Sequence, residues 1–477
     1  TAITSVNGVY RSMWTAGWST TANTHQCFGI AAYNLALDCM ADDLIMQSQG
    51  NGWFWGDHCY NVKSNYTSSA FRSYDVWYAN YKWIANVNYI IDAEPEMAGT
   101  EADVAYVAGQ AYAIRALCYL NLATWFSRAP YNPLTGASRW NEACVPVYTT
   151  GTSIDTGGQP RESLRTVYGR IDQDIDRAIE LLEKARETTL AENNKSHINL
   201  YVALGIKSRA CLAEGDWDGA FKAAKRVIDE GGYAVGTKSD LTGGMNSLGK
   251  QNVMWGAGIQ VADQAGGYAG FFTHMDNKEG AYAKSAPKLI SKQLYNRISA
   301  TDIRRDWWDP SDKESPYVSK KFSFGNVASF LGDYIYMRVE EMYFTAAEAA
   351  LRLDDLKSAR ELMNTVMAER DPGYSANNRS GTLLGATTTT WTGSFLENIL
   401  THRRIELWGE YGRLFDVRRL GQGIDRRTDD GFSEECISMM NRRNVNITKA
   451  DTYDWVLTIP KAELDANPNI NEEDQNP

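Results

Sequence analysis

Aromatic residues gather in polar, glycine-containing segments of the sequence, where their rings could bind a ligand. The clearest segment reads Asn51-Gly52-Trp53-Phe54-Trp55-Gly56 and is followed by Tyr60, Asn61 and Tyr66. A sugar ring has an apolar C–H face and a rim of hydroxyls, so it can stack on an indole while amides bond its edge. Two tryptophans between glycines are poorly explained as helix core. We therefore expect five ligand contacts here: Trp53, Trp55, Tyr60, Asn61 and Tyr66.

Two segments in the middle of the chain have the same mixture of aromatic and polar residues. One reads Gly266-Gly267-Tyr268-Ala269-Gly270-Phe271-Phe272-Thr273-His274, and the other reads Arg304-Arg305-Asp306-Trp307-Trp308-Asp309. Long loops in compact proteins usually carry function. We therefore add Tyr268, Phe272, Trp307 and Trp308 to the expected ligand contacts. Four other tryptophans follow helical spacing and are expected in the core: Trp77, Trp83, Trp125 and Trp217.

Charged residues near the C-terminus raise the alternative of catalysis, because glycoside hydrolysis requires a pair of carboxylates. The set consists of Arg338, Glu341, Glu348, Arg403, Glu406, Arg413 and Asp416. Arg403 and Glu406 stand three residues apart on an expected helix, a spacing that favours an ion pair. We interpret the set as a structural network between helices. The five histidines have no nucleophile-elbow partner, so no catalytic residue is expected.

One stretch comes close to a nucleotide-binding motif. Residues Gly244 to Lys250 fit the pattern GxxxxGK. The next residue is Gln251 rather than the Ser or Thr that would reach Mg²⁺, and no apolar strand precedes the stretch. We expect no bound nucleotide or other cofactor.

Histidines and cysteines in the first 60 residues offer metal donors without a metal-binding motif. His25 and Cys27 form one group, and Asp57, His58 and Cys59 form the other. None of the seven cysteines is part of a CxxC pair that would organise a zinc site. We expect no metal, and a Cys27–Cys59 disulfide or two free thiols instead.

Composition narrows the class of protein. The 477 residues carry a formal net charge of −11 and show no Lys/Arg stripe, which argues against nucleic acid as a partner. No apolar stretch approaches the ~18 residues that a membrane-spanning helix needs. The chain begins at Thr1 without a basic or apolar leader, which we interpret as a mature chain whose export signal has been removed.

Helical periodicity dominates the elements that would position these segments. Residues 197–232 predict two helices joined at Glu214-Gly215-Asp216, the length of a tetratricopeptide unit. Residues 338–370 repeat the pattern with a turn at Asp354-Asp355, and residues 74–126 predict an earlier pair. We therefore predict a mainly α fold, in which stacked helical hairpins carry long aromatic-rich loops and little β structure.

No linker separates parts of the chain, so we expect a single domain over residues 1–477. Within it we expect helical repeats over residues 1–232, a loop-rich insert over 233–333, and a C-terminal repeat pair and tail over 334–477.

Four separated stretches resemble the SusD/RagB family, outer-membrane lipoproteins of Bacteroidetes that capture nutrients for a partner transporter. They are Trp77–Asn88 with Gly109–Ala116, Arg338–Ala349, Ile399–Leu407 with Gly412–Arg419, and the ending from Ile459 to Pro477. The resemblance extends over essentially the whole chain. It departs from the family at His402, where Glu is usual, at Leu420, where Trp is common, and in lacking the N-terminal lipoprotein cysteine.

The resemblance implies a non-catalytic, lipid-anchored protein on the outer surface of the outer membrane. Such a protein captures an oligosaccharide and delivers it to a SusC-like TonB-dependent transporter, which the helical hairpins would face. Two alternatives stay open. One is capture of peptides, as in RagB-type members. The other is an all-helical glycoside hydrolase, which would need more helical hairpins than the three or four expected here.

Overall fold

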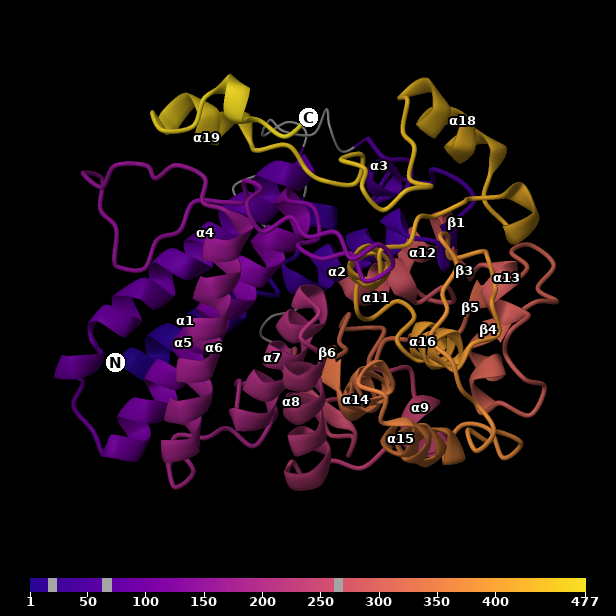
Figure 1. The fold of residues 1–477 in the computed structure, drawn as a ribbon, viewed down its shortest axis with the longest axis horizontal. Coiled ribbons are helices and arrows are strands. Elements are labelled where there is room, and N and C mark those ends of the chain that lie inside the picture. The colour runs from indigo at the N-terminus through magenta and orange to yellow at the C-terminus, as the bar shows by residue number, and fades with distance from the viewer. Residues whose placement is uncertain (16–23, 62–70, 261–268) are drawn as a thin grey trace.

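The computed structural model describes residues 1–15, 24–61, 71–260 and 269–477. The fold is mainly α-helical, which confirms the predicted fold class (Figure 1). The longer helices of the N-terminal half are α1 (Ala2–Ser12), α2 (Ile30–Met40), α4 (Phe71–Asp92), α5 (Glu101–Phe126), α6 (Leu164–Lys184), α7 (Leu200–Glu214) and α8 (Trp217–Glu230). Those of the C-terminal half are α14 (Val339–Arg352), α15 (Leu356–Ala368), α16 (Phe395–Glu406), α17 (Arg413–Arg419), α18 (Glu434–Arg442) and α19 (Lys461–Ala466).

The two helical hairpins predicted from the repeat begin their second helices in the same way. Asp216 accepts a hydrogen bond from the backbone N–H of Gly219 at the start of α8. Asp355 accepts one from the backbone N–H of Ser358 at the start of α15. An N-terminal cap of this kind satisfies a backbone donor that the helix leaves unpaired. The two aspartates therefore have the same structural role.

Small residues allow these hairpins to approach one another closely. Ala220 of α8 and Ala349 of α14 are fully buried and pack in one cluster with Cys211 and Leu212. On the N-terminal side, a Cβ atom at Gly109 of α5 would lie 2.8 Å from Leu182 of α6. Since real Cβ contacts do not become that short, α5 and α6 depend on glycine at this crossing.

β-Structure is limited to short strands in the loop-rich part of the fold. Antiparallel strands form a four-stranded sheet in the order β1 (Leu44–Met46), β3 (Lys288–Ile290), β5 (Val318–Ser319) and β4 (Trp308–Asp309). Strands β2 (Val253–Ala257) and β6 (Tyr334–Arg338) form a second, two-stranded sheet with an irregular register. The short helices of the described residues include α3 (Trp55–His58), α9 (Lys238–Leu241), α11 (Phe271–Met275), α12 (Ala281–Ser285) and α13 (Lys292–Tyr295).

The charged residues singled out in the C-terminal half form a buried ion network, as predicted. Glu406 on α16 accepts from three buried arginines: Arg304, Arg338 and Arg370. These positive charges hold the pKa of Glu406 well below its ordinary range although burial alone would raise it. The expected Arg403–Glu406 ion pair is wrong, because Arg403 pairs instead with Asp416 of α17, over 2.7 Å. The network joins α16 to its neighbours and leaves these carboxylates no proton to donate.

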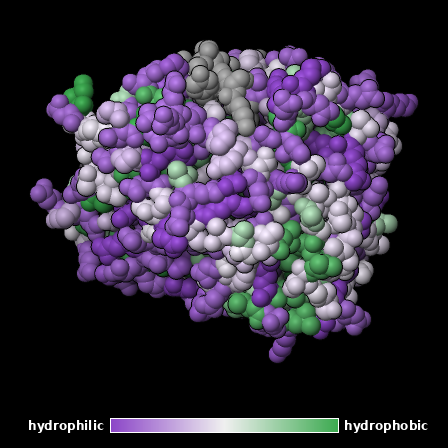
Figure 2. Space-filling model, turned by 45° about the horizontal axis from the view of Figure 1, so that its top comes forward, coloured by the Kyte–Doolittle hydropathy of each residue, from purple (hydrophilic) through white to green (hydrophobic). Residues whose placement is uncertain are grey.

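One face of the molecule shows how polar and apolar residues are distributed on its surface. The face in Figure 2 is predominantly hydrophilic, with hydrophobic residues confined to patches. Across the described ranges, no helix has the length and apolar character required to cross a bilayer.

Candidate functional site

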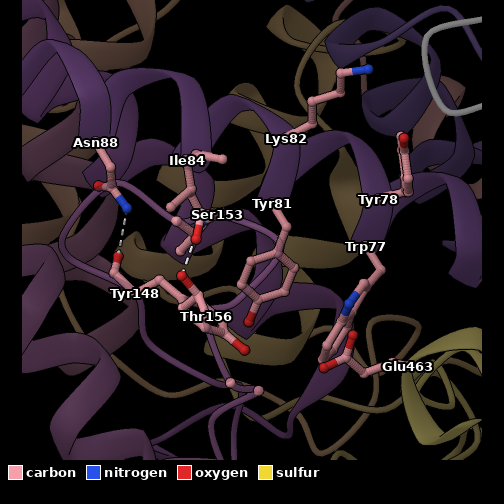
Figure 3. Close-up of a pocket in the computed structure, with 14 residues that line it drawn as sticks. Trp77, Tyr78, Tyr81, Lys82, Ile84, Asn88, Tyr148, Ser153, Thr156 and Glu463 are labelled. Atoms are coloured by element: carbon pink, nitrogen blue, oxygen red, sulfur yellow. Dashed lines mark hydrogen bonds between the residues drawn. The ribbon is translucent and has the colours of Figure 1, made fainter. Parts of the chain in front are cut away.

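A cavity of about 440 Å³ lies between α4, the segment 148–158 and α19 (Figure 3). Its volume is within the range of small-ligand sites. Helix α4 supplies one wall with Trp77, Tyr78, Tyr81, Lys82, Ile84, Ala85 and Asn88. The segment supplies the opposite wall with Tyr148, Thr152, Ser153, Thr156, Gly157 and Gly158, and α19 adds Glu463.

The tyrosines of the aromatic wall lie beside the buried stripe of α4, whereas Trp77 also packs against Phe126 of α5. One stripe of α4, which includes Val76, Trp83 and Val87, is fully buried. Tyr78 and Tyr81 lie on a neighbouring stripe and are half-buried. Helical geometry brings residues four and seven positions apart to one face. Tyr78, Tyr81, Ala85 and Asn88 therefore share a stripe of α4 that lines the cavity.

Ring contacts hold the aromatic side chains in fixed orientations. The Trp77 ring packs edge-on against Phe126, with 4.9 Å between centroids, and lies 4.9 Å from the ring of Tyr81. Tyr148 packs edge-on against Tyr81 at 5.9 Å. The Tyr81 hydroxyl donates to the carbonyl of Pro146 over 2.6 Å. Because each ring is held by at least one neighbour, the wall is preorganised for a ligand that stacks on it.

The opposite wall is held in place from α4 and α5. Asn88 donates from Nδ2 to the carbonyls of Tyr148 and Thr150, over 3.1 and 3.2 Å. Tyr119 donates to the carbonyl of Tyr148 over 2.8 Å and accepts from its N–H over 2.7 Å. Arg115 forms a bidentate ion pair with Asp174 and also donates to Asn88 Oδ1, over 2.9 Å. Buried side chains therefore fix the start of the segment 148–158.

The chemistry of the cavity suits recognition better than hydrolysis. Burial raises the pKa of Tyr81 and of Tyr148, so both phenols keep their protons near neutral pH. Glu463 supplies a carboxylate, next to Trp77 in Figure 3, whereas Tyr78 and Lys82 lie at one edge. Among the described residues that line the cavity, Glu463 is the only acid. Glycoside hydrolysis normally uses two carboxyl groups, so this lining lacks half of that machinery.

Comparison with known families and structures decides the family. The SusD family matches residues 278–477, and a second family, described as starch-binding and associating with the outer membrane, matches residues 24–212. A SusD-like carbohydrate-binding protein from Bacteroides vulgatus ATCC 8482 has a TM-score of 0.80 at 25% identity. The alignment covers 99% of this chain and 97% of that one. The chain belongs to the SusD family.

Further solved structures share the fold of this SusD-like protein at lower identity. A SusD superfamily protein from Bacteroides thetaiotaomicron VPI-5482 has a TM-score of 0.78 at 21% identity, with coverage of 100% and 99% of the two chains. Surface glycan-binding protein A from Bacteroides thetaiotaomicron, solved in complex with laminarihexaose, has a TM-score of 0.69 at 17% identity, with coverage of 100% and 98%. No curated protein matches the sequence of this SusD-like protein.

Of the nine aromatic and polar residues predicted to bind ligand, Trp53 is the one whose surroundings look most like a binding platform. Its ring is half-buried and lies parallel to His25, with centroids 4.7 Å apart and an angle of 7°. Tyr282 packs against the edge of both rings. Asn61 is also half-buried. Neither residue lines the cavity on α4, so Trp53 marks a second aromatic location of this SusD-like protein.

Five of the predicted contacts are buried, so the expected exposure of their rings is wrong. Trp55 and Trp307 are 4% exposed, and Tyr60, Phe272 and Trp308 are 2% exposed. Each ring has a packing role: Tyr60 donates to the carbonyl of Met40, and Trp307 donates to that of Leu241. Trp308 packs against Trp408, and Phe272 against Phe324. The other two, Tyr66 and Tyr268, lie outside the described residues.

The sequence reasoning missed the wall formed by Tyr78, Tyr81 and Tyr148. It assigned Trp77 to the core, and Trp77 is indeed only 6% exposed. The overlooked signal is a second aromatic stripe on the same helix, at positions 78 and 81. A helix that buries only one stripe in the core does not need aromatic residues at these positions. Glu463 and the segment 148–158 have no comparable signal, because the fold alone brings them to α4.

Proposed function

We propose that this protein is a non-catalytic glycan-binding protein that captures an oligosaccharide at the bacterial outer membrane. The observation that carries the proposal is the cavity on α4, which combines aromatic faces with a few fixed polar groups. Sugar rings stack through their C–H faces and bond through their hydroxyls, so they require both kinds of contact. Surface glycan-binding protein A, which has the same fold, was solved with laminarihexaose bound. That complex supports a glycan as the class of ligand.

The absence of catalysis is part of the proposal. The lining of the cavity includes one acid, Glu463, among the described residues. The acidic residues of α16 and α17 accept from arginines in the interior, which holds the pKa of Glu406 and Asp416 below the ordinary range. A general acid requires a raised pKa near working pH. Neither region therefore offers the acid–base pair of an inverting or retaining glycosidase.

Capture is the first step of a transfer, and we infer that the recipient is a SusC-like TonB-dependent transporter. The matched family is described as associating with the outer membrane, which supports that location for this chain. Lipid anchoring and exposure on the outer surface belong to the same proposal. The helical hairpins α7–α8 and α14–α15 offer the kind of repeat surface that proteins commonly dock on.

A peptide ligand is the second candidate. A peptide in an extended conformation gains affinity by pairing its backbone with a strand edge. The described residues that line the cavity come from helices α4 and α19 and from an irregular segment, and none of them belongs to a strand. This arrangement favours a glycan over a peptide.

Titration calorimetry against a panel of neutral and acidic oligosaccharides, with a peptide mixture as a further arm, tests the proposal. We expect heat with at least one glycan and loss of about tenfold in affinity in Tyr78→Ala, since one aromatic stacking contact contributes about 1–3 kcal/mol. Tyr201→Ala is the matched control, because Tyr201 is a half-buried tyrosine on α7 that packs against Tyr233. Heat with peptides alone, or equal loss in both variants, would contradict the assignment.

Trp53 and Asn61 stay proposed contacts of a second location. Trp53→Ala in the same titration distinguishes the two: if the glycan binds over His25 and Trp53, this variant loses affinity and Tyr78→Ala does not. Release of reducing ends from polysaccharide by the pure protein would overturn the non-catalytic part of the proposal.

A further inference from the structure

A second cavity, of about 380 Å³, lies between α1, the segment 192–197 and the sheet of β2 and β6, and we call it the β2–β6 cavity. Its volume is also within the range of small-ligand sites. Among the described residues, its lining and that of the cavity on α4 have no member in common. The lining has a buried floor and an exposed rim, which differ in chemistry.

The floor of the β2–β6 cavity is aromatic and apolar. Trp255 of β2 and Tyr336 of β6 both line it, and their rings pack edge-on with 4.9 Å between centroids. The indole N–H of Trp255 donates to the carbonyl of Ser196 over 3.2 Å, which fixes the orientation of that ring. Met13 and Ala257 add buried apolar side chains. The floor is therefore preorganised for an apolar part of a ligand.

One polar group of this floor has no partner. Tyr336 is 6% exposed, and its hydroxyl forms no hydrogen bond with the part of the chain that the structure describes. Burial raises the pKa of this phenol, so the hydroxyl keeps its proton and can donate. A buried hydroxyl without a partner is unfavourable, and such groups in native proteins require an explanation. An acceptor atom on a ligand would provide it.

The rim presents amide groups whose orientation is fixed by their neighbours. Asn194 Oδ1 accepts from the backbone N–H and from the hydroxyl of Ser196, over 3.1 and 2.6 Å. Because a backbone N–H can only donate, the oxygen of Asn194 faces Ser196 and its Nδ2 group is directed away from it. Asn7 Oδ1 accepts from Nε2 of His197 over 2.7 Å. Both asparagines are exposed, so they offer N–H donors at the rim.

The acceptor that reaches Tyr336 should be uncharged. A carboxylate in the floor would need a cation beside it. The residues of the described lining with a full charge, Arg11 and Glu192, are both exposed at the rim. His197 lines the cavity as well, but burial lowers its pKa, so it is neutral near pH 7. These features favour a carbonyl oxygen over an anion.

We propose that the β2–β6 cavity binds an N-acetylated sugar, at a site separate from the cavity on α4. The carbonyl of the acetamido group accepts from the hydroxyl of Tyr336, and the acetyl methyl packs on Trp255 and Met13. The hydroxyls of the sugar ring accept from the amides of Asn7 and Asn194 at the rim. The ligand thus matches the apolar floor, the buried donor and the polar rim at once.

Saturation-transfer NMR on the full chain, with the methyl glycosides of N-acetylglucosamine and N-acetylgalactosamine as probes, tests the proposal. We expect binding of at least one probe, with the strongest transfer to its acetyl methyl protons. The methyl glycoside of the parent sugar, with a hydroxyl in place of the acetamido group, should bind about tenfold more weakly, because it leaves Tyr336 unpaired. Equal binding of the two sugars, or no binding of either N-acetylated probe, would overturn the proposal. N-acetylalanine amide is the peptide-like arm, and its binding as tightly as the sugar would overturn the assignment to a sugar.

Two tyrosines of β6 provide a matched pair of variants. Tyr336→Phe removes only the unpartnered hydroxyl, so it should keep the thermal stability of the wild type and bind the N-acetylated sugar about threefold to tenfold more weakly. Tyr334 is also buried but is absent from the described lining, and its hydroxyl accepts from the backbone N–H of Phe271 over 3.2 Å. Tyr334→Phe should therefore lose stability and keep the affinity. Unchanged affinity in Tyr336→Phe, or equal losses of affinity in both variants, would contradict the proposed contact.

Tyr78→Ala separates this proposal from the capture of a glycan in the cavity on α4. Tyr78 lines that cavity and is absent from the described lining of the β2–β6 cavity, so the variant should bind the N-acetylated sugar as the wild type does. Loss of binding in Tyr78→Ala would place the sugar on α4 and overturn the second site, while supporting the proposed function. Binding that depends on Tyr336 alone would support the second site whatever the cavity on α4 binds.

Discussion

Arg304 donates a hydrogen bond to Nδ1 of His402 over 2.8 Å in the interior of the protein. An arginine can only donate, so Nδ1 of His402 accepts and carries no proton. Burial, followed by the charge of Arg304, lowers the pKa of His402 well below its ordinary value. The family resemblance leads us to expect a glutamate at this position, and a neutral histidine fills the same acceptor role.

Acid should therefore destabilise the protein through His402. An unfolded histidine takes up a proton below about pH 6.5, whereas folded His402 stays neutral, so stability falls as the pH decreases below that value. His402→Asn retains an acceptor and removes the titration. Between pH 7 and pH 5 we expect the wild type to lose about 1–2 kcal/mol more than the variant. Urea unfolding at both pH values measures the difference, and parallel losses would refute it.

A pair of carboxyl groups, Asp172 of α6 and Glu214 of α7, predicts the opposite dependence of stability on pH. Burial raises the pKa of Glu214, and its hydrogen bond with Asp172 raises it further. A raised folded-state pKa contributes stability below the unfolded value near pH 4.5 and loses it as the pH rises. Glu214→Gln should therefore stabilise the protein at pH 8 by more than about 1 kcal/mol and have little effect at pH 4.5. Glu187→Gln, at an exposed glutamate, is the control and should show no such trend.

The variants Trp53→Ala and Trp55→Ala should differ in stability, although the two tryptophans are only two residues apart in the sequence. Trp55 is 4% exposed, so Trp55→Ala creates a cavity and should cost about 3–5 kcal/mol. Trp53 is half-buried against His25, and its replacement by alanine should cost less than half as much. Thermal and urea unfolding of the two variants compare them directly. Equal losses would mean that the Trp53 ring belongs to the core and is no ligand platform.

The helical frame could be predicted from the sequence, because its signals are local. The pair expected at 74–91 and 102–126 corresponds to α4 at Phe71–Asp92 and α5 at Glu101–Phe126. The periodicity of apolar residues and the capping aspartates required no knowledge of distant contacts.

The site could not be predicted equally well, because exposure depends on contacts between distant segments. Trp307 and Trp308 stand in a polar stretch, yet Lys321 lies over the Trp307 ring, and Trp408 packs against Trp308. No local signal shows that a residue 100 positions away will cover an indole. Conversely, the tyrosines of α4 stay half-buried in the cavity wall because the segment 148–158, distant in the sequence, does not fill the space beside them.

The hydroxyl of Tyr119 offers a test of whether that segment positions the ligand. It donates to the carbonyl of Tyr148 and accepts from its N–H, so one side chain satisfies both backbone groups. Tyr119→Phe leaves the N–H of Tyr148 unpaired and leaves its carbonyl with Asn88 as the remaining donor, so the wall opposite α4 should move more freely. We expect a loss of about 1–3 kcal/mol in stability. We also expect a roughly fivefold to tenfold weaker affinity for the glycan that binds the wild type.

Tyr106→Phe separates positioning from a general effect of removing a buried hydroxyl. Tyr106 is on the same helix, α5, but its hydroxyl bonds to His197 over 2.7 Å, away from the cavity. Both variants should lose comparable stability, because each removes one buried hydroxyl from α5. The affinity measured by calorimetry should decrease only in Tyr119→Phe. If both variants bind as the wild type does, the ligand does not contact the wall at Tyr148, and the Trp53 location becomes the site to pursue.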